Sequence, residues 1–138
     1  MTLETTKLAV QRWHTMLQNH DMSILSELLA DDVVFRSPVA YQPYAGKQVV
    51  FFILTNVIQV FENFTYHREF YTEDGENVVL EFSANVSGKS LKGIDMVRFN
   101  AQGKIIDFEV MIRPMSGLAA LAEKMGARFA QYQPNASQ

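Results

Sequence analysis

The chain has 138 residues, of which 48% are hydrophobic and ten are phenylalanine, so there is enough apolar material for one well-buried core. Its net charge of −3, with only 12 lysines and arginines, provides no basic patch that could neutralise a phosphate backbone, and we expect no nucleic-acid partner. The absence of cysteine excludes disulfides, thiolate zinc sites and cysteine nucleophiles.

The N-terminal segment lacks the basic stretch followed by an apolar stretch that is typical of an export signal. The longest apolar run, residues 49–54, is far too short to cross a membrane. We therefore expect no membrane partner and, by default, a cytoplasmic location. No repeat or linker divides the chain, which predicts a single domain over residues 1–133 and a frayed tail over residues 134–138.

Helical periodicity predicts a first helix over residues 3–19, with Trp13 on its apolar stripe. Asp21 is a suitable N-cap for a second, short helix that ends near Leu29. Residues 33–37 are β-rich and stop at Pro38, and residues 41–46 form a loop. A third helix, from residue 47 to about residue 61, is apolar almost all round, which predicts deep burial.

The hydrophobic period then changes from 3.6 to 2, which predicts strands over residues 64–72, 79–87, 91–99 and 104–113. An Asp74-Gly75 turn joins the first two. In the second strand the apolar residues alternate with polar ones, a pattern typical of a sheet with one face on a core and one in water. Pro114 ends the last strand, and Ser116 is a fair N-cap for a closing amphipathic helix.

This order of elements predicts an α+β fold. We expect a cone-shaped, curved antiparallel sheet that wraps around the helices, encloses a pocket and carries the C-terminal helix as a cap.

Two segments of the chain resemble a known family. Residues 93–105 (GIDMVRFNAQGKI) closely resemble the paired strands of bacterial ketosteroid isomerases, and residues 29–38 (LADDVVFRSP), with the loop to Gly46, resemble the first strand and loop of that family. The wider group is the nuclear transport factor 2-like superfamily, which includes SnoaL-like polyketide cyclases. The resemblance covers about residues 5–113, and the closing helix is similar to that of SnoaL-like relatives. It implies a cystatin-like fold and a homodimer.

The resemblance also implies positions for three catalytic roles. The protonated acid that holds the oxyanion falls on Asp95. The carboxylate base falls on Ser37, which cannot serve as a carboxylate, and the tyrosine donor falls on Trp13, whose indole N–H can donate but is not acidic. Because one of the three roles is retained, the resemblance does not carry steroid isomerisation over to this chain.

By strand parity and by the resemblance, Asp95 points into the pocket. Desolvation there should raise its pKa, and the carboxyl could then donate a hydrogen bond to a ligand carbonyl or oxyanion. The alternative is a structural aspartate bonded to Trp13 or Ser37.

The other candidate ligand-binding residues lie on the predicted pocket wall or rim. They are Trp13, Phe35, Ser37, Tyr41, Tyr44, Leu54, Phe61, Phe82, Val97, Phe108 and Val110. Trp13 and Ser37 are candidate donors, and Tyr41 and Tyr44 belong to the loop at the pocket mouth. The phenylalanines fit either a solid core or a pocket wall, and the family resemblance favours the wall.

The three histidines do not have the spacing of metal ligands, so we expect no metal and no organic cofactor. His14 and His20, six residues apart, are expected on different faces of the first helix. His67 is expected to be solvated or paired across strands.

Two functional hypotheses follow. In the first, the pocket binds a small apolar molecule that bears a carbonyl or hydroxyl, and an enzyme of this kind would use Asp95 as an acid in isomerisation, cyclisation or hydration. In the second, the convex sheet face, with Glu109, Met111 and Arg113, serves a non-catalytic interaction or dimerisation module. An epoxide-hydrolase-like mechanism needs two acids and an arginine inside, whereas the inner parity offers Asp95 alone.

Overall fold

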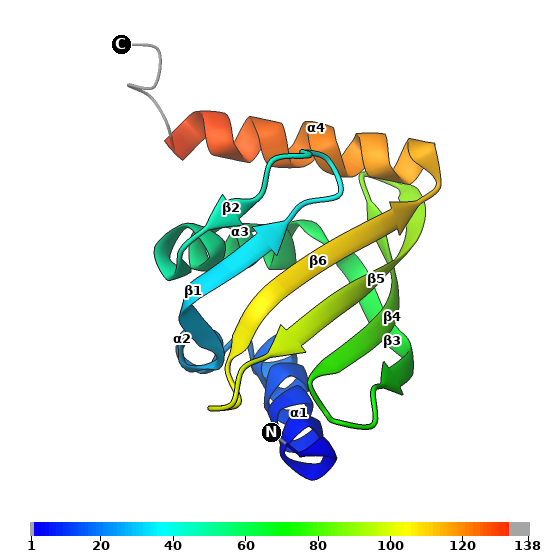
Figure 1. Cartoon of the computed structure of the whole chain (residues 1–138). Coiled ribbons are helices and arrows are strands. Elements are labelled where there is room, and N and C mark those ends of the chain that lie inside the picture. Colours follow the sequence, from blue (N-terminus) through cyan, green and yellow to red (C-terminus); the bar gives the residue numbers. More distant parts are fainter. Residues whose placement is uncertain (1, 133–138) are drawn as a thin grey trace.

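The computed structural model describes residues 2–132, which form four helices and six strands in the order that Figure 1 shows. The helices are α1 (Leu3–Asn19), α2 (Met22–Leu28), α3 (Lys47–Val60) and α4 (Met115–Tyr132). The strands are β1 (Leu29–Arg36), β2 (Tyr44–Ala45), β3 (Glu62–Tyr71), β4 (Asn77–Val86), β5 (Lys89–Phe99) and β6 (Ile105–Arg113). The predicted tail, residues 134–138, lies outside the described residues.

The strands form one curved, open sheet in the order β2-β1-β6-β5-β4-β3. The meander β3–β6 is antiparallel throughout, as predicted. The strand β1 instead pairs parallel to β6, because the chain passes over the sheet through α3 before the meander begins. The sheet is therefore mixed, and the expectation of an all-antiparallel sheet is corrected at this one junction.

Local chemistry explains where the helices begin. Thr2 and Thr5 form a reciprocal capping box at the start of α1, and Asp21 caps α2 as predicted. The predicted cap of the last helix is wrong: α4 begins at Met115, one residue earlier than Ser116. The carbonyl of Pro114 accepts the first helical hydrogen bond, from the backbone N–H of Leu118, at 3.0 Å.

The first strand and the loop after it also differ from the prediction. Strand β1 begins at Leu29, four residues earlier than the β-rich run, since Leu29 and Ala30 are buried beside β6. Tyr44 and Ala45, predicted as loop, form a short edge strand opposite Phe35 and Val34. Both differences arise from pairing with a partner strand, which local propensity does not report.

The sheet curves around α3, with α1 at one end and α4 across the other (Figure 1). One buried cluster joins α1, α2, β1 and α3 to the sheet, and a second lies beneath α4, where Leu121 and Met125 meet Phe82, Val86 and Leu91. Burial of apolar side chains in these two clusters holds the helices on the concave side of the sheet. None of the helices in residues 2–132 is long and apolar enough to cross a membrane.

Candidate functional site

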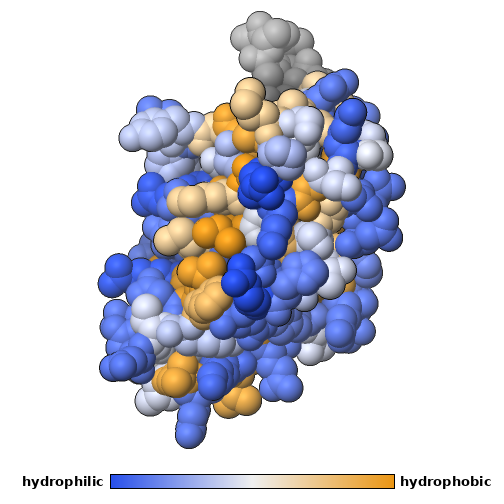
Figure 2. Space-filling model, turned by 90° about the vertical axis from the view of Figure 1, so that its right-hand side faces the viewer, coloured by the Kyte–Doolittle hydropathy of each residue, from blue (hydrophilic) through white to orange (hydrophobic). Residues whose placement is uncertain are grey.

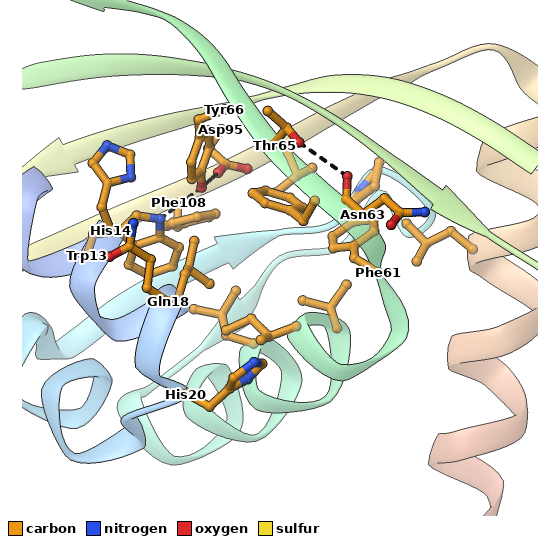
Figure 3. Close-up of a pocket in the computed structure, with 18 of the residues that line it drawn as sticks. Trp13, His14, Gln18, His20, Phe61, Asn63, Thr65, Tyr66, Asp95 and Phe108 are labelled. Atoms are coloured by element: carbon orange, nitrogen blue, oxygen red, sulfur yellow. Dashed lines mark hydrogen bonds between the residues drawn. The ribbon is translucent and has the colours of Figure 1, made fainter.

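A cavity of about 570 Å³ lies on the concave side of the sheet, among α1, α3 and the strands (Figure 3). It is lined by Trp13, His14, Leu17, Gln18, His20, Phe35, Pro38, Leu54, Val57, Ile58, Phe61, Asn63, Phe64, Thr65, Tyr66, Asp95, Phe108, Val110 and Leu121. The lining is mostly apolar and aromatic, which is typical of a small-molecule site.

Aromatic packing supports one wall of the cavity. The ring centroid of Phe108 lies 5.2 Å from that of Trp13 and 6.0 Å from that of Phe35. These three residues come from β6, α1 and β1, and contacts of this length are favourable when the rings are tilted, as here. The wall therefore joins three elements that are distant in sequence.

Asp95 is the acid of the cavity. It lies in the middle of β5, opposite Leu80 on β4 and Val110 on β6, and only 5% of its surface is exposed. Strand parity places its side chain on the concave face with its neighbours Gly93 and Val97, which are also buried. A buried carboxyl is costly unless it has partners, so its hydrogen bonds decide what it can do.

The partner of Asp95 is Tyr66 on β3, and Trp13 completes a chain of three side chains. The indole N–H of Trp13 donates to Tyr66 Oη at 2.8 Å, and Tyr66 Oη donates to Asp95 Oδ2 at 2.6 Å. Figure 3 shows these three side chains close together among the residues that line the cavity. The expected partners of a structural aspartate, Trp13 or Ser37, are therefore corrected: Trp13 acts through Tyr66, and Ser37 does not take part.

The second carboxyl oxygen of Asp95 remains available. No side chain or backbone group in residues 2–132 forms a hydrogen bond with Oδ1. The same residues contain no buried side-chain polar atom that lacks a partner, so Oδ1 is not sealed off and reaches the cavity space. A ligand oxygen could take this position.

Burial sets the protonation of this pair. Desolvation raises the pKa of Asp95 to about 7, although the hydrogen bond from Tyr66 opposes the rise. Burial also raises the pKa of Tyr66 well above its usual value, and the neighbouring charge of Asp95 adds to this effect. Near neutral pH a large fraction of Asp95 therefore carries a proton that it can donate, while Tyr66 stays neutral.

The structure divides the sequence-predicted residues into two groups. Those on the cavity lining are Trp13, Phe35, Leu54, Phe61, Asp95, Phe108 and Val110. Those away from it are Ser37, Tyr41, Tyr44, Phe82 and Val97. Contact of any of them with a ligand stays a prediction.

The contacts of the second group explain why these residues do not line the cavity. Ser37 Oγ accepts the backbone N–H of Val39 at 3.1 Å, so it serves its own loop. Tyr41 is 99% exposed, and Tyr44 is held at the sheet edge by pairing with β1. Phe82 and Val97 have the predicted inward parity, but they are fully packed in the two buried clusters. These five residues therefore lie outside the cavity lining of this structure, and their predicted contact with a ligand stays a prediction.

Several cavity residues, above all Tyr66, were not among the residues predicted from the sequence. The sequence did contain an indication of Tyr66, since Phe64 and Tyr66 are two residues apart in β3 and so point to the same, inner face of the sheet. His14 and His20 were expected on different faces, yet both line the cavity. His20 ends α1 in the left-handed conformation, with φ of 51°, so helical periodicity no longer applies to its side chain.

The curved sheet, its helices and the enclosed acid define a cystatin-like α+β domain with a cavity on its concave side. The chain belongs to the SnoaL-like domain family, whose model matches residues 10–108. This result confirms the resemblance found in the two sequence segments and the fold class that it implied. No curated protein matches the chain significantly in sequence.

Solved structures support the same placement. A crystal structure of a steroid delta-isomerase from Pseudomonas aeruginosa is 53% identical, with a TM-score of 0.90 over 94% of this chain and 95% of that chain. A protein with a cystatin-like fold from Silicibacter pomeroyi is 35% identical, with a TM-score of 0.80 over 87% of this chain and 84% of that chain.

A more distant structure contains a ligand. A Mycobacterium tuberculosis protein in complex with estradiol-17beta-hemisuccinate is 20% identical, with a TM-score of 0.64 over 80% of this chain and 98% of that chain. At this identity the likeness concerns the fold alone.

Proposed function

We propose that the cavity binds a hydrophobic ring compound that bears a carbonyl or hydroxyl group, and that Asp95 holds this oxygen. The observation that carries the proposal is the Trp13–Tyr66–Asp95 chain, which ends in a free carboxyl oxygen inside an apolar cavity. A neutral acid in such a place donates a hydrogen bond that strengthens as negative charge develops on the ligand oxygen.

The dimensions of the cavity support this class of ligand. A volume of about 570 Å³ lies within the range of roughly 300–1,000 Å³ that is usual for drug-sized molecules. The names of two related structures, a steroid delta-isomerase and a complex with an estradiol derivative, make steroids and smaller fused-ring ketones suitable first probes. If turnover occurs, polarisation by Asp95 supports isomerisation or cyclisation.

The experiment compares two ligands that differ only in the carbonyl, 2-tetralone and tetralin, by isothermal calorimetry. We expect Asp95→Ala to weaken the affinity for the ketone about tenfold, corresponding to the roughly 1–2 kcal/mol of a hydrogen bond, with little change for the hydrocarbon. Asp95→Asn, which keeps an amide donor, should retain part of the preference. Equal losses for both ligands, or no binding of either to the unaltered protein, would reject the proposal.

A second function, a homodimerisation module, is favoured by the convex face of the sheet. Phe70, Met96 and Met111 are exposed there. In the strand register, Phe70 and Met96 both pair with Val79, so they lie in one row across β3, β4 and β5. Met111 pairs with Ile94 in the neighbouring row. Figure 2 shows hydrophobic residues between hydrophilic ones on the side of the molecule where β3 and β4 lie.

An ion-pair group lies within this convex face, in which the carboxylate of Glu81 is buried and its two cationic partners, Arg68 and Lys92, are exposed. Glu81 Oε2 is 2.6 Å from Arg68 Nη2 and 3.2 Å from Lys92 Nζ. The hydrogen bond from Arg68 is the main reason that the pKa of Glu81 falls to about 2. We infer that a second copy of the chain covers the exposed methionines. Sedimentation should then show a dimer that Met96→Glu dissociates, whereas a monomer at high micromolar concentration would contradict this inference.

A further inference from the structure

A second polar pair lies at the same cavity, formed by His14 on α1 and Glu69 on β3. His14 Nε2 lies 2.6 Å from Glu69 Oε2, and the two side chains are 29% and 33% exposed. The residues are 55 positions apart in the chain, so the pair exists only because the fold brings α1 against β3.

The carboxylate of Glu69 is held in place on both oxygens. Tyr71 Oη donates to Oε1 at 2.9 Å, while Oε2 faces His14. A fixed carboxylate on one ring nitrogen of a neutral histidine keeps the proton on that nitrogen. The Nε2–H tautomer is therefore favoured, and Nδ1 is left with a lone pair. In residues 2–132 no group forms a hydrogen bond with Nδ1 of His14.

The imidazole lies close to the group that would hold the ligand oxygen. Its ring centroid is 5.0 Å from that of Tyr66, edge to face, and Tyr66 is the hydrogen-bond donor of Asp95. Figure 3 shows the ring of His14 beside Tyr66 and Asp95, at the same end of the cavity. An acid and a candidate base are thus placed around one ligand position.

The other polar groups of the cavity are less suited to accept a proton. Ser37 lies away from the lining, and its hydroxyl would be a weak base. His20 lines the cavity, but no carboxylate in the described part of the chain orients it. Tyr66 is neutral and already donates to Asp95.

We propose that His14, oriented by Glu69, accepts a proton from a carbon next to the carbonyl that Asp95 holds. The inference rests on the proposed function and specifies its substrate class as ketones with an acidic α-hydrogen. His14 is the catalytic residue, and Glu69 is a positioning residue that acts through it.

The step balances without a co-reactant. The α C–H bond breaks, its proton moves to Nδ1, and its electron pair forms a carbon–carbon double bond. The π electrons of the carbonyl move onto oxygen, where the hydrogen bond from Asp95 stabilises the enolate. Exchange occurs when the proton on Nδ1 is replaced by a deuteron from the solvent and that deuteron is delivered to the same carbon. Delivery of the proton to a conjugated carbon of an unsaturated ketone gives isomerisation. Histidine suits both directions near neutral pH.

The test is the exchange of the α-hydrogens of 2-tetralone in D2O, followed by proton NMR, with affinity measured separately by calorimetry. The full-length protein should accelerate exchange above the buffer rate. His14→Gln should reduce the protein-dependent rate by about 10²-fold or more, the usual contribution of a general base, while the dissociation constant changes less than about threefold. His67→Gln is the matched control: His67 lies off the cavity, bonded to Ser83, and its replacement should leave the rate unchanged.

Two further variants separate chemistry from structure. Added imidazole should restore exchange to His14→Ala, because it can occupy the space of the lost ring. Glu69→Gln should lower the rate and also mix the His14 tautomers, which the nitrogen-15 shifts of the ring report directly. A purely structural tie between α1 and β3 would give no rescue by imidazole, and the tautomer change in Glu69→Gln would then leave the exchange rate unaltered.

The outcomes distinguish this inference from the proposed function. Binding of 2-tetralone with exchange at the buffer rate, or with exchange that His14→Gln does not slow, overturns the role of His14 and leaves the binding site intact. Absence of binding overturns the proposed function and the inference together.

Discussion

Tyr66 on β3 and Asp95 on β5 are joined by a 2.6 Å hydrogen bond that passes over the concave face of β4, the strand between them. Their partners in β4 are Phe82 and Leu80 respectively, so the bond runs diagonally across two buried apolar side chains. This bond gives the buried carboxyl one partner and leaves its other oxygen for a ligand. It also opposes the rise that burial causes in the pKa of Asp95, so the protonation of this carboxyl can be measured through the bond.

The first prediction concerns stability as a function of pH. Because the pKa of Asp95 is raised to about 7, the folded chain binds this proton more tightly than the unfolded chain does. The stabilisation is complete below the unfolded pKa of about 3.8 and is lost as the pH rises through about 7. At about 1.4 kcal/mol per pKa unit, up to about 4 kcal/mol is involved.

Urea denaturation of the unaltered protein and Asp95→Asn measures this effect, because asparagine resembles the protonated acid but does not titrate. The variant should gain stability relative to the unaltered protein as the pH rises from about 4 to about 8. A difference that stays constant with pH would show that the carboxyl has an ordinary pKa.

The second prediction concerns Tyr66→Phe. Loss of the hydroxyl removes the hydrogen bond that lowers the pKa of Asp95, so this pKa should rise above about 7. The indole N–H of Trp13 also loses its acceptor, and we expect a loss of about 1–3 kcal/mol in the free energy of unfolding. A carbon-13 NMR titration of the Asp95 carboxyl measures the shift. Tyr41→Phe, on a fully exposed ring, should change neither quantity.

The third prediction tests whether the ligand occupies the cavity. Val110 lines the cavity directly opposite Asp95 in the strand register, so Val110→Phe should fill the space that a ligand needs. The affinity for 2-tetralone should fall at least about tenfold while the fold persists, since the added ring enters a cavity rather than a packed core. Val39→Phe, on an exposed loop side chain, is the control. Undiminished binding by Val110→Phe would place the ligand elsewhere.

The fourth prediction compares two glycines. A Cβ on Gly93 would lie 2.5 Å from the carbonyl oxygen of Met111 and 2.7 Å from Cζ of Phe82, so Gly93→Ala should cost about 1–3 kcal/mol. A Cβ on Gly126, in α4, would meet no atom within 4 Å, so Gly126→Ala should stabilise by about 0.5–1 kcal/mol. Thermal unfolding of both variants decides this, and destabilisation of similar size in both would contradict the packing of β5.

The sequence alone predicted much of the fold for physical reasons that act locally. The alternation of Leu80, Phe82, Ala84 and Val86 identified the buried face of β4, and all four are buried. Asp95 could be assigned to the inner face because β5 is regular around it. The pattern and the family resemblance pointed to the same side of the sheet.

The place of Glu69 could not be predicted in this way, because a bulge changes the parity of β3 after Tyr66. The pairing of β3 with β4 shifts between Tyr66 and Glu69. Because of this bulge, both side chains face α1, although residues three positions apart in a regular strand point to opposite faces. Simple alternation would have placed Glu69 in solvent. The convex face also departs from the simple pattern, since Glu81 is buried there between Arg68 and Lys92.

The carbonyl carbon-13 shift of labelled 2-tetralone bound to the protein reports directly whether Asp95 holds the ligand oxygen. If Asp95 donates a hydrogen bond inside an apolar cavity, the bound carbonyl should resonate downfield of the ketone in water, and Asp95→Ala should abolish the difference. A bound shift equal to that in an apolar solvent, unaffected by removal of Asp95, would show that Asp95 does not hold the ligand oxygen.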